Sequence, residues 1–400
     1  MDGGAELGRG YNGAVIDIVN PRDASDKRTL VHMLTPSAAS DDGWVVYTLG
    51  GGGGSKTKGA AAKERKITTA AAKADILAAL GKAGDFVAKI TLERPNFSQE
   101  GIFAKELHAT TTILQAYGTA GAAHVAVEPV PLPLPGMRTP GRAIAIVVPA
   151  LKMYVIFNRR CGSTLDKVTL SSDAMCKAMV LHLLKSLSLL HASGWIHTDI
   201  KPDNVIVCHK GGSKKAQFKV IDWGGAVQYN HPGGLSDVFT LVTVMRTRSP
   251  VAWFVAGSST TVAVAASKLV LTLLYKKQAL GSAPVSVAID AMMAGFTRYI
   301  GAHTAHVALS KKGGNKTLMA PMTPDDAVRC AVMADKLPCI DTASLAIALA
   351  AVVFEPRHKL SRGATDRMRT FIHERMLVMD HPRYVGDCAA TLLAKAASEL

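Results

Sequence analysis

Three polar residues stand at spacings that phosphoryl transfer requires. Asp199 and Asn204 lie close together in a polar segment, and Asp222 directly follows the apolar pair Val220-Ile221. Phosphoryl transfer asks a protein mainly to position reactants and to stabilise charge. One carboxylate orients the attacking hydroxyl, while an amide and a second carboxylate hold Mg²⁺ against nucleotide phosphates. We expect Asp199 to fill the first role, and Asn204 and Asp222 to be the metal ligands.

These segments resemble the eukaryotic protein kinase catalytic loop, His-Arg-Asp-x-Lys-Pro-x-x-Asn, and the metal-binding Asp-Phe-Gly turn. The chain has Thr198 in place of the Arg and Trp223 in place of the Phe. The resemblance implies ATP and Mg²⁺ as cofactors and protein hydroxyls as acceptors. It also implies that Lys201 neutralises the γ-phosphate and that the acceptor is Ser or Thr, because Lys201 matches the Lys that Ser/Thr kinases place in this loop.

A kinase also needs a glycine-rich turn near its start. The stretch from Leu7 to Val15 has the form G-x-G-x-x-G, in which missing side chains let backbone N–H groups approach phosphates. The expected nucleotide-binding residues here are Gly8, Gly10, Gly13 and Val15.

A lysine for the α- and β-phosphates should follow on a strand. Lys89 sits in the β-prone run Phe86 to Ile90, whose V-A-K resembles the V-A-x-K form but lacks the residue between Ala and Lys. A helix from about Ser98 should then supply a glutamate that orients Lys89. We assign this role to Glu106, since Glu100 lies in the first turn, where an acidic residue mostly interacts with the helix dipole.

The run from Ala143 to Leu151 is apolar and is interrupted by Pro149, which cannot continue a β-ladder. We expect the hinge between two lobes at this point, with Val148 as the gatekeeper of the nucleotide site. The Val-Val-Pro ending resembles herpesvirus-type Ser/Thr kinases, which suggests a large DNA virus as the source.

The resemblance implies a two-lobed α+β fold, with a five-strand-type lobe at residues 1–150 and a helical lobe at residues 151–400. Apolar residues recur at helical spacing between Ser172 and Ser193, which predicts a core helix that delivers the catalytic loop. Residues 16–85 are longer than a hairpin needs and are expected to be an insertion. Within them, the Gly- and Lys-rich tract from Gly50 to Lys66 has no apolar period, and we expect it to be disordered.

The downstream part of the chain departs from the family pattern. Pro250 is followed by Val251 where the family has a Glu, and the segment from Glu355 to Lys359 has Lys359 where the family has the Arg that pairs with that Glu. Loss of both partners avoids an unpaired buried charge. Asp290 resembles the helix Asp that braces the catalytic loop, with an ordinary helix-start Asp as the alternative.

Composition limits the partners and the compartment. Lys and Arg number 46 against 31 Asp and Glu, a net charge of +15, which favours acidic partners: nucleotide phosphates, acidic protein substrates or nucleic acid. Charge alone does not choose among these, and a basic surface that serves solubility is the alternative. The six cysteines show no paired C-x-x-C spacing, so we expect neither a zinc site nor disulfides, and hence a reducing compartment. The N-terminus has no signal-peptide pattern, and the apolar run from Leu345 to Phe354 is too short to span a bilayer. We expect an intracellular protein of the cytoplasm or nucleus, with no membrane partner.

Two other functions remain open at this point. A pseudokinase would keep the fold as a scaffold without turnover, although every chemical position holds a competent residue. A small-molecule phosphotransferase of the aminoglycoside type shares the His-x-Asp and Asn pattern. The Lys201-Pro202 pair and the Ser249-Pro250 segment favour a protein substrate.

Overall fold

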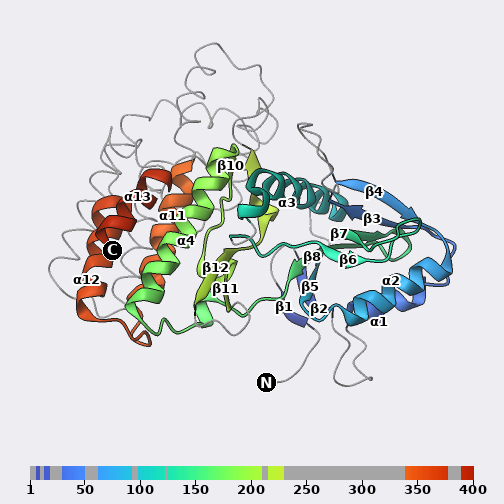
Figure 1. Cartoon of the computed structure of the whole chain (residues 1–400), viewed down its shortest axis with the longest axis horizontal. Helices are drawn as coiled ribbons and strands as arrows, with labels where there is room; N and C mark the ends of the chain where they lie inside the picture. The colour runs from blue at the N-terminus through green and yellow to red at the C-terminus, as the bar shows by residue number, and fades with distance from the viewer. Residues whose placement is uncertain are drawn as a thin grey trace, which may run out of the picture. The chain divides into compact units, whose positions relative to one another are not determined.

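The structure of this chain is a computed structural model that describes residues 6–9, 13–18, 29–49, 62–91, 98–121, 124–209, 215–228, 338–376 and 389–400. The chain divides into two compact units, Met1–Cys161 and Gly162–Leu400. The first unit is built mainly on a sheet and the second is rich in helices (Figure 1), which confirms the expected α+β class. The division falls later than the expected boundary at residue 150, because the strand Met153–Arg159 belongs to the sheet of the first unit.

The first unit contains one eight-stranded sheet in the order β1-β2-β5-β8-β7-β3-β4, with β6 paired to β7. The strands are β1 (Glu6–Arg9), β2 (Gly13–Asp17), β3 (Trp44–Thr48), β4 (Lys63–Ile67), β5 (Phe86–Thr91), β6 (Val130–Leu132), β7 (Gly141–Val148) and β8 (Met153–Arg159). All pairings are antiparallel. The expected five-strand-type sheet is therefore too small, because the inserted region adds β3 and β4 beside β7 and the chain before β7 adds β6.

Helices cover both faces of this sheet. Side chains alternate along a strand, so β3 sends Trp44 and Val46 to one face and Val45 and Tyr47 to the other. The first face packs against α1 (Leu30–Leu34) and α2 (Ala70–Lys82), both of which come from the inserted region. The second face packs against α3 (Gln99–Gly121), and the three layers are visible in Figure 1. The inserted region is thus a structural part of the unit.

Strand β4 corrects the expectation that Gly50 to Lys66 lacks structure. Residues 50–61 lie outside the described residues, but Lys63–Ile67 pair with β3 along their whole length. Four of the five residues are exposed, and only Ile67 enters the core. A charged strand at a sheet edge is held by backbone hydrogen bonds and resists pairing with other chains, so it needs no apolar period.

The expected hinge at Val148 is wrong. Strand β7 ends at Val148, and the 3-10 turn Pro149–Leu151 leads straight back into β8, with Val148 paired to Met153. The side chain of Val148 is 1% exposed and belongs to the core on the α1–α2 face. Pro149 therefore ends a strand, as expected, but within a hairpin of the first unit. The gatekeeper role of Val148 and the herpesvirus-type hinge based on it are not supported.

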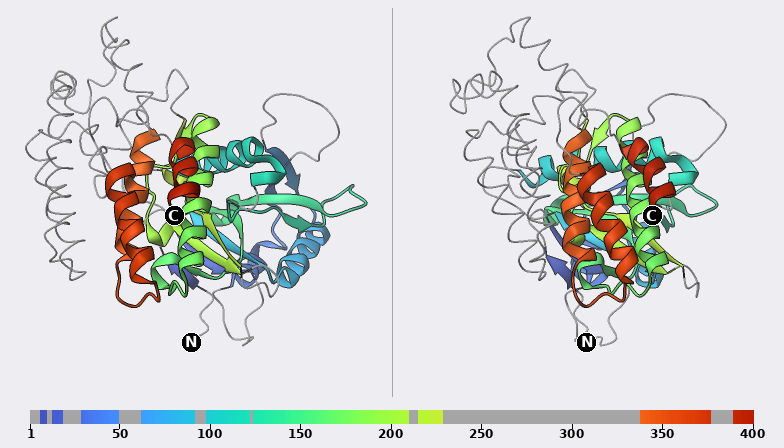
Figure 2. Two further views of the ribbon diagram at one scale, coloured as in Figure 1. Left: turned by 60° about the vertical axis from the view of Figure 1, so that its left-hand side comes forward. Right: turned by 90° about the vertical axis from the view of Figure 1, so that its left-hand side faces the viewer.

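The second unit is organised around α4 (Asp173–Ala192), the core helix that the spacing predicted. Ser172 caps it by accepting a hydrogen bond from the Met175 N–H, and its buried face carries Met179, Leu183 and Leu187. The later helices among the described residues are α11 (Pro338–Val353), α12 (Arg362–Phe371), a π-helical turn (Ile372–Met376) and α13 (Ala389–Glu399). Figure 2 shows these C-terminal helices beside α4. No helix within the described parts of the chain is long and apolar enough to cross a bilayer.

The segment Glu355 to Lys359 follows α11 directly and binds the stretch before α4. The Lys359 N–H donates to the Leu170 carbonyl, and the Leu170 N–H donates to Nδ1 of His358 (2.9 Å). A main-chain hydrogen bond therefore keeps Lys359 beside Leu170. Val251, which stands where the family has the Glu that pairs with the position of Lys359, lies outside the described residues.

The cysteines differ from expectation. Cys161 and Cys208 are disulfide-bonded, whereas Cys176 is free and buried. Burial, together with the Asp173 charge, raises the pKa of the Cys176 thiol to about 12. Spacing along the chain could not reveal the disulfide-bonded residues, because bonding depends on the distance between sulfur atoms in the folded chain.

Candidate active site

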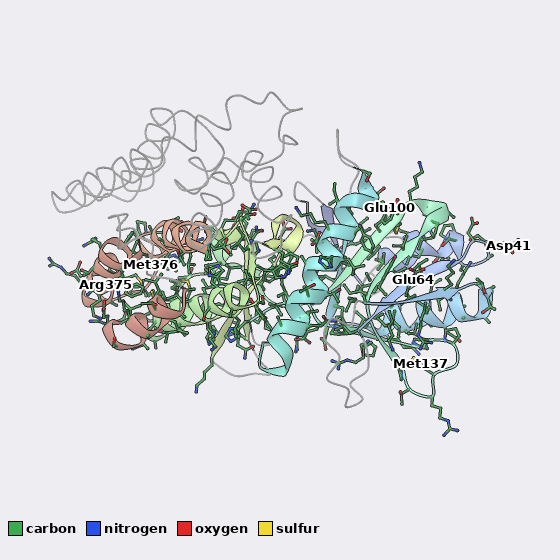
Figure 3. All side chains as sticks on the ribbon, turned by 90° about the horizontal axis from the view of Figure 1, so that it is seen from above. Asp41, Glu64, Glu100, Met137, Arg375 and Met376 are labelled. Atoms are coloured by element: carbon green, nitrogen blue, oxygen red, sulfur yellow. The ribbon has the colours of Figure 1, made fainter. Side chains whose placement is uncertain are left out.

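Lys89 and Glu106 form a buried ion pair in the first unit. Their Nζ and Oε1 atoms are 2.7 Å apart, and the residues are 7% and 3% exposed. Lys89 projects from β5 on the face that carries α3, since its neighbours Ala88 and Ile90 belong to the core of the opposite face. Glu100 lies exposed in the first turn of α3 (Figure 3), so the structure brings Lys89 together with Glu106, as the sequence predicted.

Gly13 lets the glycine-rich segment approach this lysine. A Cβ atom at Gly13 would lie 2.6 Å from the Ile90 carbonyl oxygen and 3.2 Å from Cε of Lys89, so any side chain would displace β5 or Lys89. Val15 pairs with Lys89 across the β2–β5 ladder. Gly8 lies in β1, and Gly10 lies outside the described residues.

The catalytic-loop residues form a cluster in the second unit. Nδ2 of Asn204 donates to the Asp199 carbonyl oxygen (2.9 Å) and to Oδ2 of Asp199 (3.0 Å). Nζ of Lys201 lies 2.8 Å from the same Oδ2. The Asp199 N–H donates to Nδ1 of His197 (3.3 Å), which further orients the acid. The structure therefore brings together the three residues that were predicted from adjacent sequence.

A β-hairpin places Asp222 near Asn204. Strand β11 (Val205–His209) begins directly after Asn204, and β12 (Ala216–Val220) ends shortly before Asp222. Val205 pairs with Val220, so both expected metal ligands lie at the same end of the hairpin, and the Ile221 N–H donates to the Asn204 carbonyl (2.9 Å).

The turn that contains Asp222 is held in an unusual conformation. Asp222 has φ 66° and ψ 69°, and Thr198 has φ 69°, a left-handed region that costs a non-glycine residue about 1 kcal/mol or more. Hydrogen bonds to residues before and after Asp222 in the sequence stabilise this conformation. Nε2 of His197 binds the Ile221 carbonyl (3.0 Å), and Oγ1 of Thr198 donates to the Gly225 carbonyl (2.8 Å).

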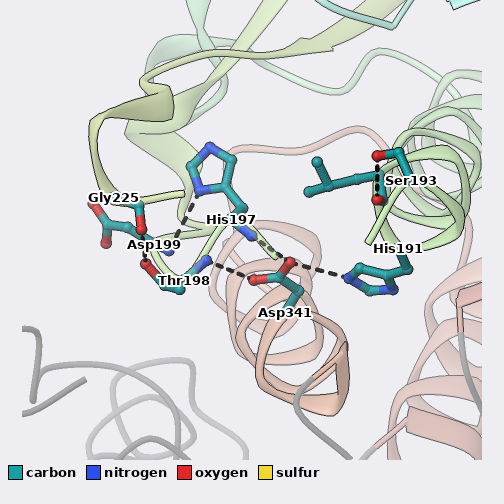
Figure 4. Close-up of polar contacts among 8 residues, drawn as sticks. His191, Ser193, His197, Thr198, Asp199, Gly225 and Asp341 are labelled. Carbon is teal, nitrogen blue, oxygen red and sulfur yellow. Dashed lines mark hydrogen bonds and ion pairs between the residues drawn. The ribbon is translucent and has the colours of Figure 1, made fainter. Parts of the chain in front are cut away.

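A buried aspartate on α11 braces the catalytic loop from behind (Figure 4). Asp341 is 0% exposed and accepts hydrogen bonds from the N–H groups of His197 (2.7 Å) and Thr198 (2.8 Å). Its Oδ2 also lies 3.1 Å from Nε2 of His191 at the end of α4. This is the bracing role that the sequence assigned to Asp290, which lies outside the described residues.

A signal for Asp341 was present in the sequence. Asp341-Thr342-Ala343-Ser344-Leu345-Ala346 opens a strongly apolar helix, and its Asp and Ser stand where the motif Asp-x-Trp-Ser-x-Gly has them. It was missed because the connection from Pro250 is unusually long and because Ala343 replaces the Trp.

Comparison with protein families decides the identity of this site. Residues 143–251, which include β7, β8, the Asp199 loop and the Asp222 turn, match the family described as the protein kinase domain. This part of the chain is similar to the eukaryotic-type protein kinase superfamily. The two units described above are accordingly those of the two-lobed protein kinase fold.

Proteins similar to part of this chain are named as serine/threonine-protein kinases. One from Drosophila persimilis is 32% identical over 84 residues, which is 20% of this chain and 11% of the relative. A Dictyostelium discoideum protein, named a probable serine/threonine-protein kinase, is 43% identical over 54 residues, 14% of this chain and 8% of the relative. The chain thus spans about a tenth of the length of the curated relatives it matches.

The residues at this site fit the magnesium–nucleotide complex that the protein kinase family uses. Because both donors of the Asn204 amide point to Asp199, its oxygen is the atom left to bind a cation. Among the described residues there is no group of three or more His, Cys, Asp or Glu that would hold a metal by itself. Mg²⁺ typically takes one or two protein ligands together with substrate phosphates, as Asn204 and Asp222 would provide.

Proposed function

We propose that this chain is a serine/threonine protein kinase that transfers the γ-phosphate of ATP to protein hydroxyls. The observation that carries the proposal is the contact of Asp199 with both Lys201 and Asn204, at the end of the hairpin that leads to Asp222. A base, a cation and two metal ligands are the groups that phosphoryl transfer needs.

Asp199 would orient the attacking hydroxyl. Its contacts with Lys201 and Asn204 both involve Oδ2, which leaves Oδ1 as the oxygen for a substrate hydroxyl. Asn204 and the His197 imidazole keep the acid in one orientation. Lys201, which lies beside Asp199, would also bring positive charge to the transferred phosphate.

Lys89 would bind the α- and β-phosphates. Glu106 holds its ammonium group in place, and burial of both residues makes the pair less sensitive to salt than a surface pair. Bound ATP supplies the phosphoryl group, and Mg²⁺ at Asn204 and Asp222 would neutralise charge on its phosphates.

The proposed acceptors are serine and threonine in acidic surroundings. Lys201 matches the catalytic-loop lysine of Ser/Thr kinases, and the relatives carry that description in their names. The net charge of +15 and the pair Arg246 and Arg248 near Pro250 favour acidic sequences around the acceptor. Both arginines lie outside the described residues.

The experiment incubates the purified chain with labelled ATP, Mg²⁺ and a panel of acidic and basic proteins, followed by phosphoamino-acid analysis. We expect phosphoserine or phosphothreonine, mainly in acidic substrates. Lys89→Met, Asp199→Asn and Asp222→Asn should each lower turnover by about a hundredfold or more. Asn tolerates the left-handed conformation of Asp222, so that variant should fold.

Other outcomes would replace the proposal. If the parent transfers no label to protein or peptide, or if all three variants match the parent, the chain acts as a scaffold with a kinase fold. Label found only in small molecules would indicate a phosphotransferase of that class. Phosphotyrosine as the main product would exclude the Ser/Thr assignment.

A further inference from the structure

Helix α3, which carries Glu106, is held on the sheet by three aromatic rings. Phe103 lies between Tyr47 of β3 and Tyr154 of β8, with ring centroids 5.8 Å and 5.3 Å apart. The Tyr47–Phe103 pair is edge-to-face, with an interplanar angle of 61°, and the Phe103–Tyr154 pair is tilted at 52°. Aromatic pairs favour such non-sandwich arrangements at these separations. Phe103 is 3% exposed, so its ring is a buried apolar anchor of this helix face.

The position of Phe103 on α3 couples this anchor to the ion pair. Glu106 and Leu107 follow Phe103 by three and four residues, the spacing that places side chains on one face of a helix. Leu107 packs in the same cluster as Phe103, and Glu106 reaches Lys89 from the same face. Rotation of α3 about its axis would therefore move both Phe103 and Glu106 from their partners.

One of the two rings that contact Phe103 comes from the inserted region. β3 places Val45, Tyr47 and Leu49 on the α3 side of the sheet, and all three pack against the Phe103 cluster. The strand itself is rigid, because it pairs with β7 on one side and β4 on the other, and buries Trp44 and Val46 on the opposite face. Figure 1 shows β3 and β4 at the sheet edge near α3.

We propose that the inserted strand β3 is a built-in positioning element for α3, and that Tyr47 is a positioning residue that keeps Glu106 against Lys89. This inference rests on the proposed kinase function and assigns the insertion a part in it. Tyr47 touches neither Lys89 nor Glu106 in the contacts described, and acts through Phe103. Loss of its ring leaves α3 with one aromatic contact and more freedom to rotate.

The test compares Tyr47→Ala with Tyr47→Phe in the full chain. We expect Tyr47→Ala to lower kcat/KM for ATP by about tenfold, the upper range for loss of one aromatic pair. Tyr47→Phe keeps the ring and should stay within about twofold of the parent, since the ring and not the hydroxyl contacts Phe103.

A double-mutant cycle separates positioning from general packing. If Tyr47 acts through Glu106, then adding Tyr47→Ala to Glu106→Gln should change kcat/KM by less than about twofold. Leu77→Ala is the matched control, because Leu77 lies on inserted helix α2 and packs on the opposite face of the sheet. It should lower the melting temperature while leaving kcat/KM near the parent value.

Three results would overturn the inference: an unchanged kcat/KM in Tyr47→Ala, an equal loss in the Glu106→Gln background, or an equal loss in Leu77→Ala. These leave the parent active, so they are distinct from failure of the proposed function, in which the parent itself transfers no phosphate. If the parent transfers no phosphate, the parent and Tyr47→Ala are compared by their affinity for a fluorescent ATP analogue. Equal affinities would overturn the inference.

Discussion

The Thr198 hydroxyl donates a 2.8 Å hydrogen bond to the Gly225 carbonyl and so ties the catalytic loop to the turn that contains Asp222. Thr198 stands where the family has an Arg, the residue that in many members grips a phosphate on the activation segment. Here a short neutral side chain reaches the turn directly. The turn that contains Asp222 therefore has a tether that needs no added phosphate.

Replacement of Thr198 should weaken the use of Mg²⁺. Thr198→Val keeps the shape and the branched Cβ but removes the donor to Gly225, a loss of about 1–3 kcal/mol for a buried hydrogen bond. We expect the Mg²⁺ concentration for half-maximal activity to rise several-fold, whereas Thr198→Ser should behave as the parent. The measurement is kinase activity over a Mg²⁺ titration. Equal Mg²⁺ concentrations for half-maximal activity in Thr198→Val and Thr198→Ser would show that this hydrogen bond has no role in the use of Mg²⁺.

The same tether predicts activity without prior phosphorylation. A neutral Thr198 offers no cationic fork for a phosphate between Gly224 and Pro250. Protein treated with phosphatase and then freed of it should phosphorylate substrates at the untreated rate. A loss of activity that is restored by rephosphorylation of this segment would contradict the prediction.

Replacement of Asp341 and replacement of Asp290 should affect stability and kinase activity differently. Asp341→Ala removes a buried acceptor from His197, Thr198 and His191, which should destabilise the chain by about 3–5 kcal/mol. Its melting temperature and kinase activity should both fall. Asp290→Ala is the control and should leave both near the parent values. Thermal unfolding and activity of the two variants decide which aspartate braces the loop, and the reverse pattern would restore the assignment of Asp290.

Gly13 should tolerate no side chain. Gly13→Ala brings Cβ within 2.6 Å of the Ile90 carbonyl and close to Lys89, so β2 or the lysine must shift. We expect KM for ATP to rise about tenfold. Gly43→Ala is the matched control, since its nearest contacts would be ordinary ones at 3.5 Å and 3.7 Å. If the two variants bind ATP equally well, close approach at Gly13 is unimportant.

His358 should make stability depend on pH. Burial, followed by the Arg357 charge, lowers the pKa of His358 below its ordinary 6.5, and its Nδ1 must be unprotonated to accept from the Leu170 N–H. As pH falls through 6.5 the unfolded chain takes up this proton first, so stability present above 6.5 declines toward the lower folded pKa. His358→Asn keeps an acceptor and should show a shallower decline between pH 7.5 and 5.5.

The measurement for His358 is the urea midpoint of unfolding at these two pH values. A residual decline should remain in His358→Asn, because burial also lowers the pKa of His182, whose Nδ1 accepts from the Phe218 N–H. Parallel pH dependence in the parent and in His358→Asn would contradict the prediction.

The sequence by itself determined the chemical residues that lie close together along the chain. Asp199, Lys201 and Asn204 occupy one loop, so their spacing alone predicts that they meet. Lys89 and Glu106 were found because they follow the glycine-rich turn in the order and spacing of the family that the chain resembles, Lys89 on a β-prone run and Glu106 on a helix-like segment. Helix α4 was predictable because a buried helix face repeats every three to four residues.

The tertiary structure decided what depends on contacts between distant segments. Asp341 reaches Thr198 across 143 residues, and since Asp341 and Asp290 each match only part of the same motif, the sequence could not choose between them. The sequence predicted that a strand ends at Val148 and Pro149, and the structure agrees. Only the pairing of β8 with β7 and β5 shows that a hairpin follows there. Backbone hydrogen bonds to β7 fix the place of β3 beneath α3, and nearly any side chain permits such bonds. The contact of the Tyr47 ring with Phe103 therefore could not be predicted from the sequence.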